Sequence, residues 1–90
     1  MWDYLLVGPA EKQLKKYRKS QEYIKFKKAI QELTYSSDPT ELGERKDIAG
    51  VSYLCYDVTH SLRLLYNVDT KKNLIIIFGL GDHKDVYGKD

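Results

Sequence analysis

Apolar residues recur along the chain at a helical spacing in two segments. In residues 9–19 and again in residues 21–35 they fall three and four positions apart, which places them on one face of an α-helix. The first stripe consists of Ala10, Leu14 and Tyr17, and the second of Tyr23, Phe26, Ile30 and Leu33. Pro9 suits the first helical position, and Ser20 suits a helix cap. The pattern predicts two consecutive helices that share an apolar seam.

The remaining apolar segments have the features of strands. Residues 2–7 and 52–58 are rich in aromatic and aliphatic side chains, and residues 74–78 form a continuous apolar run typical of a buried strand. In residues 62–69 apolar positions alternate with others, which leaves Arg63 on the face opposite the core. The side chains expected to point inward are Leu62, Leu64, Tyr66 and Val68.

Turn-forming segments separate these elements. Ser36-Ser37-Asp38-Pro39 ends the second helix, and we expect a loop from there to about Gly50. Thr59-His60-Ser61 is a short hairpin turn, and residues 70–73 form another. The element order is therefore β-α-α-β-β-β. It predicts an α+β fold in which an N-terminal strand and a two-helix hairpin precede a three-stranded antiparallel meander. The helices should cover one face of the sheet and leave the face with Arg63 open.

Composition supports one globular domain spanning residues 1–90. The chain is too short for an enzyme with a separate cofactor domain, and it is 42% hydrophobic and 31% charged, as folded proteins are. Its single cysteine, Cys55, excludes a disulfide within a monomer and every multi-cysteine zinc pattern. The longest apolar run, Leu74–Phe78, is too short to cross a bilayer, and the N-terminus lacks a signal-peptide pattern. We therefore expect a cytoplasmic protein without membrane contact.

Charge is unevenly distributed along the chain. Residues 1–35 contain eight Lys or Arg and four Asp or Glu, whereas residues 36–90 contain seven and nine. A local basic surface can attract a polyanion even when the whole chain carries a net charge of only +2. The lysines expected to point away from the apolar seam are Lys12, Lys15, Lys16, Lys19, Lys25, Lys27 and Lys28. They suit sequence-independent binding of an RNA backbone, although most such runs are solvated helix faces.

Three local patterns, together with this element order, resemble the RelE/ParE superfamily of toxins from toxin–antitoxin pairs. Residues 61–68 (Ser-Leu-Arg-Leu-Leu-Tyr-Asn-Val) look like the family's Arg-Leu-x-Tyr-x-Val strand, and residues 81–87 (Gly-Asp-His-Lys-Asp-Val-Tyr) look like its closing Gly-x-His-x-x-Val-Tyr. Asp38-Pro39, followed by Gly43 and Lys46, is the third pattern. The resemblance covers nearly the whole chain. It implies a RelE-like fold, with a ribonuclease activity in the RelE branch and inhibition of DNA gyrase in the ParE branch.

RNA cleavage without a metal needs a base for the 2′-OH proton, an acid for the 5′-oxygen and cations for the phosphorane. Histidine titrates near neutral pH, and His83 follows the last strand, so it is the leading acid or base. The resemblance implies that Arg63 stabilises the phosphorane and that Tyr87 orients the nucleotide. Each has a plainer interpretation: a surface histidine, an ion pair between Arg63 and Asp57, and a tyrosine that anchors the C-terminus.

Further residues are candidates for RNA contact, although each is more often a solvated side chain: His60, Arg45, Lys46 and Lys84. Residues 53–57, interpreted as the second strand of the sheet, hold no Lys or Arg. The resemblance places lysines on that strand in the best-known RelE enzymes. The difference favours a histidine-based scheme, as in YafQ-like and YoeB-like members.

The sequence thus predicts the toxin of a toxin–antitoxin pair that cleaves mRNA on the ribosome by 2′-OH attack and so inhibits translation. It predicts no metal and no small-molecule cofactor, because His60, His83 and Cys55 do not make a closed zinc site and the acidic residues lack two-metal spacing. The expected partners are a cognate antitoxin, the ribosome and mRNA. Two alternatives stay open: a ParE-type gyrase inhibitor that acts by binding, and a degenerate member without toxicity.

Overall fold

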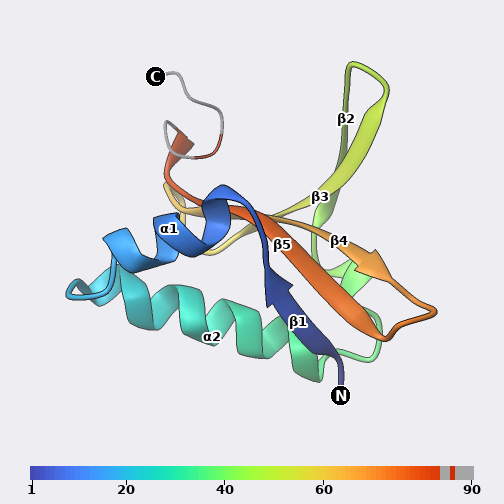
Figure 1. Ribbon diagram of the computed structural model, residues 1–90, viewed down its shortest axis with the longest axis horizontal. Coiled ribbons are helices and arrows are strands. Elements are labelled where there is room, and N and C mark those ends of the chain that lie inside the picture. Colours follow the sequence, from blue (N-terminus) through green and yellow to red (C-terminus); the bar gives the residue numbers. More distant parts are fainter. Residues whose placement is uncertain (84–85, 87–90) are drawn as a thin grey trace.

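A mixed five-stranded sheet forms the centre of the molecule, and helices α1 and α2 pack on one of its faces (Figure 1). The computed structural model describes residues 1–83 and 86. Its elements are β1 (Asp3–Leu6), α1 (Pro9–Lys16), α2 (Gln21–Tyr35), the short 3-10 helix η1 (Pro39–Glu41), β2 (Glu44–Ile48), β3 (Val51–Asp57), β4 (Arg63–Asp69) and β5 (Leu74–Gly81). The expected α+β class is confirmed.

The strand order across the sheet is β1-β5-β4-β3-β2. Neighbouring strands β2 to β5 are antiparallel, which confirms the predicted meander in β3, β4 and β5. β1 lies parallel to β5, with Asp3 opposite Leu74 and Leu6 opposite Ile77. The two helices follow β1 and precede β2 in the chain, so they connect the two opposite edges of the sheet.

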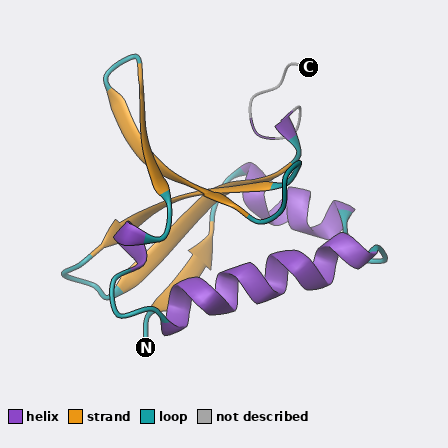
Figure 2. Ribbon diagram, turned by 180° about the vertical axis from the view of Figure 1, so that it is seen from behind, coloured by secondary structure: helices purple, strands orange, loops and turns teal. Residues whose placement is uncertain are grey.

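The prediction of a loop up to Gly50 is wrong, because residues 44–48 form strand β2. This strand is at the edge of the sheet and pairs with β3 alone, so its polar Glu-Arg-Lys-Asp sequence is compatible with water on one side. Ala49 and Gly50 link the two strands with φ angles of 52° and 81°, the positive values that a tight hairpin turn needs. Figures 1 and 2 show the β2–β3 hairpin projecting from the body of the molecule, away from the helices.

The main core lies between the sheet and the helices. Leu62, Leu64 and Tyr66 are buried there and Val68 packs against them, as the alternation in this segment predicts. The helices contribute the predicted apolar seam: Ala10, Leu14, Phe26, Ile30 and Leu33 are buried, and Tyr17 and Tyr23 pack beside them. The centroids of the Tyr17 and Phe26 rings lie 5.1 Å apart, so the two helices meet through aromatic contact.

The helix-free face of the sheet is less open than expected. Tyr53, Cys55 and Leu65 are buried there as a second, smaller cluster, and Phe78 and Val86 pack against it. The register of β4 and β5 shifts beside Leu65, which pairs with Gly79, while Tyr66 pairs with Ile77. Phe78 is therefore an extra residue in β5, as in a β-bulge. The bulge lets Ile77 and Leu80 both reach the main core.

The helix ends differ in detail from the prediction. Pro9 occupies the first turn of α1 as expected, but α1 ends at Lys16 rather than at residue 19. α2 has the predicted bounds, and Ser20 precedes it. The Ser20 hydroxyl does not cap the helix; it donates to the backbone oxygen of Tyr17 at 2.9 Å and so closes the turn between α1 and α2.

Tyr66 ties the connection between α2 and β2 to the centre of the sheet. Its side chain is fully buried, and its hydroxyl donates to the Pro39 carbonyl oxygen at 2.6 Å. Burial raises the pKa of Tyr66 to about 12, so the hydroxyl keeps its proton at neutral pH. A Cβ at Gly43 would lie 2.6 Å from the same hydroxyl, which explains the glycine just before β2. The path of the chain into β2 therefore depends on this contact.

Tyr66→Phe tests that dependence. It leaves the Pro39 carbonyl without its buried donor, so we expect the free energy of unfolding to fall by about 1–3 kcal/mol in urea denaturation. Tyr35→Phe, which removes a hydroxyl from an exposed ring, is the matched control and should change stability by less than about 0.5 kcal/mol. Equal stability of the two variants would contradict the role of Tyr66.

Candidate functional site

Arg63 begins β4 and lies on the helix-free face of the sheet. Its direct neighbours in register are Asp57 on β3 and Gly81 on β5. Arg63 Nε is 3.7 Å from Asp57 Oδ1, which is the ion pair considered as the plainer interpretation of Arg63. The Arg63 side chain is 34% exposed and that of Asp57 is 70% exposed. An exposed ion pair of this kind contributes little to stability. Arg63 can therefore exchange Asp57 for the anionic group of a ligand.

His83 lies two residues beyond Gly81, the β5 neighbour of Arg63. Gly81 has a φ angle of 133°, a conformation that favours glycine, and it turns the chain out of the strand. The Val86 backbone N–H donates to the backbone carbonyl oxygen of Asp82 at 3.1 Å. Val86 also packs against the cluster of Tyr53, Cys55 and Leu65. Val86, three residues after His83, therefore packs on the same face as Arg63, and the histidine itself is exposed.

Strand β2 adds two charged groups to this face. Glu44 pairs with Cys55 and Lys46 pairs with Tyr53, and paired residues of antiparallel strands point to the same side of a sheet. The β3 partner of Glu44 is two residues before Asp57, the β3 partner of Arg63, and the β3 partner of Lys46 is four residues before it. Glu44 is therefore nearer to Arg63 along the sheet than Lys46 is. The arginine face, as we call it, is defined by Arg63, Glu44 and Lys46 around the cluster of Tyr53, Cys55 and Leu65. His83 lies three residues before Val86, which packs on that cluster.

Two conclusions drawn from the sequence change with β2. The second strand in the chain does carry cations, so the absence of Lys and Arg from residues 53–57 does not argue against a lysine in the site. Arg45 and Lys46, each a candidate for RNA contact, point to opposite faces because they are adjacent in a strand. The sequence analysis did not name Glu44 as a candidate. The Ala49-Gly50 pair, which follows the polar residues 44–47, was the available signal for a hairpin turn and hence for a strand there.

The cations of the arginine face are each near a carboxylate. Lys46 Nζ lies 3.3 Å from Glu44 Oε1, in addition to the pair of Arg63 with Asp57. These charges are partly or largely exposed, so the pairs are easily exchanged for another anion. The face thus combines cations that can bind a phosphate with carboxylates that can transfer protons.

Other predicted residues lie elsewhere or outside the described part of the chain. Lys12, Lys15, Lys16 and Lys19 belong to α1 and the turn after it, on the opposite side of the sheet. Lys15 pairs with Glu11 at 3.8 Å, and Lys16 lies 5.4 Å from the centre of the Tyr17 ring. His60 is exposed in the β3–β4 turn. Lys84 and Tyr87 fall outside the described residues.

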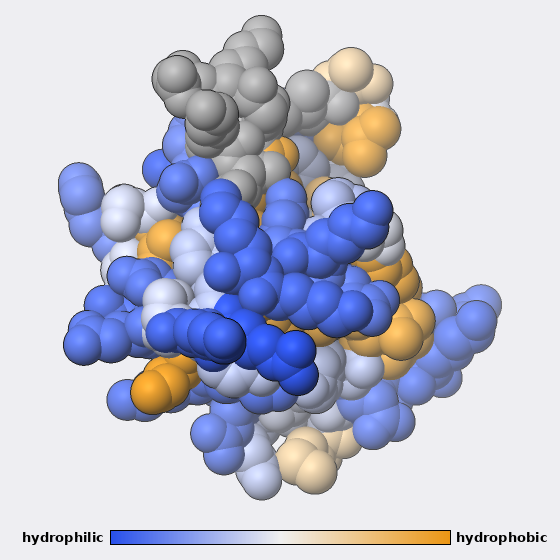
Figure 3. Space-filling view, turned by 60° about the vertical axis from the view of Figure 1, so that its left-hand side comes forward, coloured by the Kyte–Doolittle hydropathy of each residue, from blue (hydrophilic) through white to orange (hydrophobic). Residues whose placement is uncertain are grey.

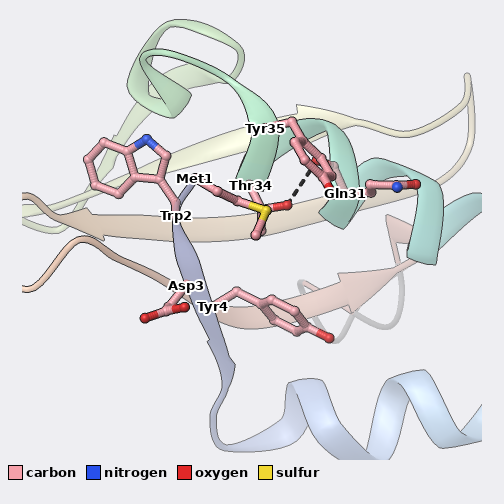
Figure 4. A pocket seen from close by; sticks show the side chains of 7 residues that line it. All are labelled: Met1, Trp2, Asp3, Tyr4, Gln31, Thr34 and Tyr35. Carbon is pink, nitrogen blue, oxygen red and sulfur yellow. Dashed lines mark hydrogen bonds between the residues drawn. The ribbon is translucent and has the colours of Figure 1, made fainter.

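The helix side of the molecule is strongly hydrophilic in Figure 3, as the lysine pattern predicts. A hollow of about 440 Å³ lies between the start of β1 and the end of α2 (Figure 4). Its lining residues are Met1, Trp2, Asp3, Tyr4, Gln31, Thr34 and Tyr35. None of them is a candidate for RNA cleavage, so this hollow is separate from the arginine face.

Comparison with known proteins shows the fold. No protein-family model and no curated relative matches the chain. A toxin from Helicobacter pylori, described as metal-bound, matches with a TM-score of 0.74 at 16% identity, over 97% of this chain and 100% of its own. A chain of the YoeB–YefM complex from Staphylococcus aureus matches with a TM-score of 0.67 at 17% identity, over 92% of this chain and 98% of its own. A chain of the toxin–antitoxin complex RelBE2 from Mycobacterium tuberculosis matches with a TM-score of 0.63 at 16% identity, over 91% of this chain and 98% of its own.

These likenesses establish that the chain has the fold of toxins from toxin–antitoxin systems, as the sequence patterns implied. Bound metal is a property of the Helicobacter toxin. In the described part of this chain no three His, Cys, Asp or Glu side chains gather closely enough to hold a metal ion. No helix among the described residues is long and apolar enough to cross a membrane.

A double-mutant cycle measures how strongly Arg63 depends on Asp57. We expect the variants Arg63→Gln and Asp57→Asn, alone and combined, to give a coupling energy below about 1 kcal/mol in urea denaturation, because both groups are in contact with water. A coupling of about 2 kcal/mol or more would mean that the arginine serves the fold, and it would contradict a role in binding an anion.

Proposed function

We propose that this protein is the toxin of a toxin–antitoxin pair and that it cleaves mRNA on the ribosome without a metal. The fold supports the first part, since similar structures include a Helicobacter toxin and a toxin–antitoxin complex. The second part is supported by one observation: β4 and β2 bring Arg63, Glu44 and Lys46 to one face of the sheet, and Val86, three residues after His83, packs on that face. Residues far apart in sequence thus supply both phosphate-binding and proton-transferring groups.

Each group has a role in 2′-OH attack on the adjacent phosphate. The Arg63 guanidinium binds the phosphate in a bidentate manner and stabilises the charge of the phosphorane. His83 acts as an acid or base, since imidazole can do either near neutral pH. Glu44 carries a carboxylate on the same face and supplies the complementary proton transfer, while Lys46 contacts a neighbouring phosphate. Tyr87 remains a prediction, in which it orients the nucleotide.

Proton and charge balance fixes the products. The base takes the 2′-OH proton, the 2′-oxygen bonds to phosphorus, and the bond to the 5′-oxygen breaks as the acid gives that oxygen a proton. The upstream fragment then ends in a 2′,3′-cyclic phosphate or the 3′-phosphate formed from it, and the downstream fragment begins with a 5′-OH. A 5′-phosphate with a 3′-OH would contradict this mechanism.

Ribosome contact is assigned to the helix side. Lys12, Lys15, Lys16 and Lys19 lie across the sheet from the arginine face, so they can contact ribosomal RNA while the opposite face holds the message. Such contacts depend on charge rather than on base sequence. Cleavage in a translation reaction should therefore weaken with added salt more steeply than cleavage of free RNA.

An antitoxin is the proposed partner. Strand β1 is at the edge of the sheet, and it carries or adjoins the exposed apolar residues Met1, Tyr4, Leu5 and Tyr35. An edge strand beside apolar side chains favours the addition of an extended segment from another protein. The YoeB–YefM and RelBE2 structures are complexes, which supports a partnered state. If no protein encoded beside its gene relieves the inhibition of translation, this partner assignment is wrong.

Replacing His83 tests the catalytic assignment. In a reconstituted translation reaction with a defined mRNA, we expect His83→Ala to slow cleavage about 10²–10⁴-fold, because one proton-transfer group is lost. His60→Ala is the matched comparison, since it removes the other histidine, and it should slow cleavage by much less. Circular dichroism and urea denaturation confirm that both variants are folded.

The remaining outcomes each exclude part of the proposal. Equal cleavage by wild type and His83→Ala would keep the ribonuclease and move the proton transfer to Glu44, Lys46 or His60. Failure of the folded wild-type chain to cleave any mRNA would exclude the ribonuclease. A supercoiling assay with DNA gyrase then separates the ParE-type inhibitor, which blocks gyrase, from a non-toxic relative, which blocks neither process.

A further inference from the structure

A second hollow lies on the helix side, where α2 passes the end of β3. It has a volume of about 270 Å³, room for several water molecules at about 30 Å³ each. Its lining residues are Lys25, Lys28, Ala29 and Glu32 on α2, and Tyr56, Val58 and Thr59 at the end of β3 and in the turn that follows. We call it the lysine hollow. None of its lining residues belongs to the arginine face.

The hollow gathers hydrogen-bond donors. Lys25 and Lys28 are three positions apart and so lie on one face of α2. The Thr59 Oγ1 accepts the backbone N–H groups of Ser61 at 3.3 Å and Leu62 at 3.2 Å. A hydroxyl oxygen that accepts twice still has its own proton to donate. Two lysines and a threonine with a fixed hydroxyl therefore line the same small space.

Two carboxylates oppose these cations: Glu32 lines the hollow and is hydrogen-bonded to a tyrosine, and Glu22 on α2 interacts with Lys25. The Tyr56 hydroxyl donates to Glu32 Oε2 across the hollow, which joins β3 to α2. Burial, together with the neighbouring Glu32, raises the pKa of Tyr56 to about 12, so the hydroxyl remains a donor at neutral pH. The residues that line the hollow thus carry two positive charges and one negative charge, and the negative charge is already hydrogen-bonded.

We propose that the lysine hollow binds a phosphate group of an RNA strand. Lys25, Lys28 and the Thr59 hydroxyl supply the donors, while Tyr56, Val58 and Ala29 form the less polar wall on which a sugar or base can rest. The hollow is lined by mixed polar and apolar groups, as a nucleotide unit is itself, and its excess of positive charge matches a phosphate.

The position of the hollow explains why RNA is the source of that phosphate. Tyr56 and Asp57 are adjacent at the end of β3 and point to opposite faces, and Asp57 is the neighbour of Arg63. The lysine hollow and Arg63 therefore lie at the same end of the sheet, on either side of the β3–β4 turn that holds His60. An RNA strand that passes over this turn reaches both the lysine hollow and Arg63, whereas a free phosphate occupies only one of them.

Binding of a cleavage-resistant RNA tests the proposal. A short fluorescein-labelled 2′-O-methyl RNA lacks the attacking 2′-OH, so its fluorescence anisotropy reports binding whether or not the protein is a ribonuclease. We expect Lys25→Gln with Lys28→Gln to raise the Kd about fivefold or more, and to reduce the slope of log Kd against log salt by about 1.4. Lys71→Gln with Lys72→Gln, in the β4–β5 turn at the other end of the sheet, removes the same charge and should change Kd by less than about twofold.

Glu32 provides a second, opposite readout. Glu32→Gln removes the opposing charge but keeps an oxygen for the Tyr56 hydroxyl, so we expect tighter RNA binding by about twofold or more. Glu41→Gln, at the exposed last residue of η1, makes the same charge change at a residue that does not line the hollow and serves as the control. Urea denaturation of each variant ensures that the comparison is between folded proteins.

The outcomes separate this proposal from its alternatives. Equal weakening by the hollow and the control lysine pairs would overturn it, because binding would then follow net charge alone. If inorganic phosphate shifts the NMR signals of Thr59 and Lys28 but RNA binding is unchanged in every variant, the assignment to RNA is wrong and a free phosphate compound occupies the hollow. Because the probe cannot be cleaved, failure of the ribonuclease proposal leaves this result intact.

Discussion

The alternation of side chains along β4 is the constraint on which the rest of the structure depends. Leu64 and Tyr66 point to the helices, while Arg63 and Leu65 point to the opposite face. Because β4 is bonded to β3 on one side and β5 on the other, a shift by one residue would bury Arg63 and expose Tyr66. The buried side chains of β4 therefore fix the register of the sheet, and that register determines which polar residues share a face with Arg63.

Two local features then bring distant segments to Arg63. The Tyr66 hydroxyl holds the Pro39 carbonyl, and this contact directs the chain into β2, which carries Glu44 and Lys46. The φ angle of Gly81 turns the chain out of β5, and Val86 packs on the smaller cluster of the arginine face. The same fold that buries the core thus assembles a charged surface from three separate parts of the chain.

Basic groups are divided between the two sides of the sheet. On the arginine face each cation is close to a carboxylate, and such exposed pairs are weak enough to be replaced by a phosphate. On the helix side, Lys25 and Lys28 face a carboxylate that the Tyr56 hydroxyl already holds. The β3–β4 turn connects the two sides, so an RNA strand that binds both would bend around the end of the sheet. In the proposed function, a near-neutral chain binds RNA in this way because its charges are grouped by position.

The sequence by itself determined the elements whose signals are local. The periodicity of residues 21–35 predicted both ends of α2, and the alternation in residues 62–69 predicted the inward set of β4. Strand β2 was missed because a polar edge strand has no hydrophobic alternation, and its existence depends on pairing with β3. The parallel pairing of β1 with β5, the separation of Arg45 from Lys46 and the place of Glu44 were decided by tertiary structure. Strand register is a relation between distant segments, and no short stretch of sequence contains it.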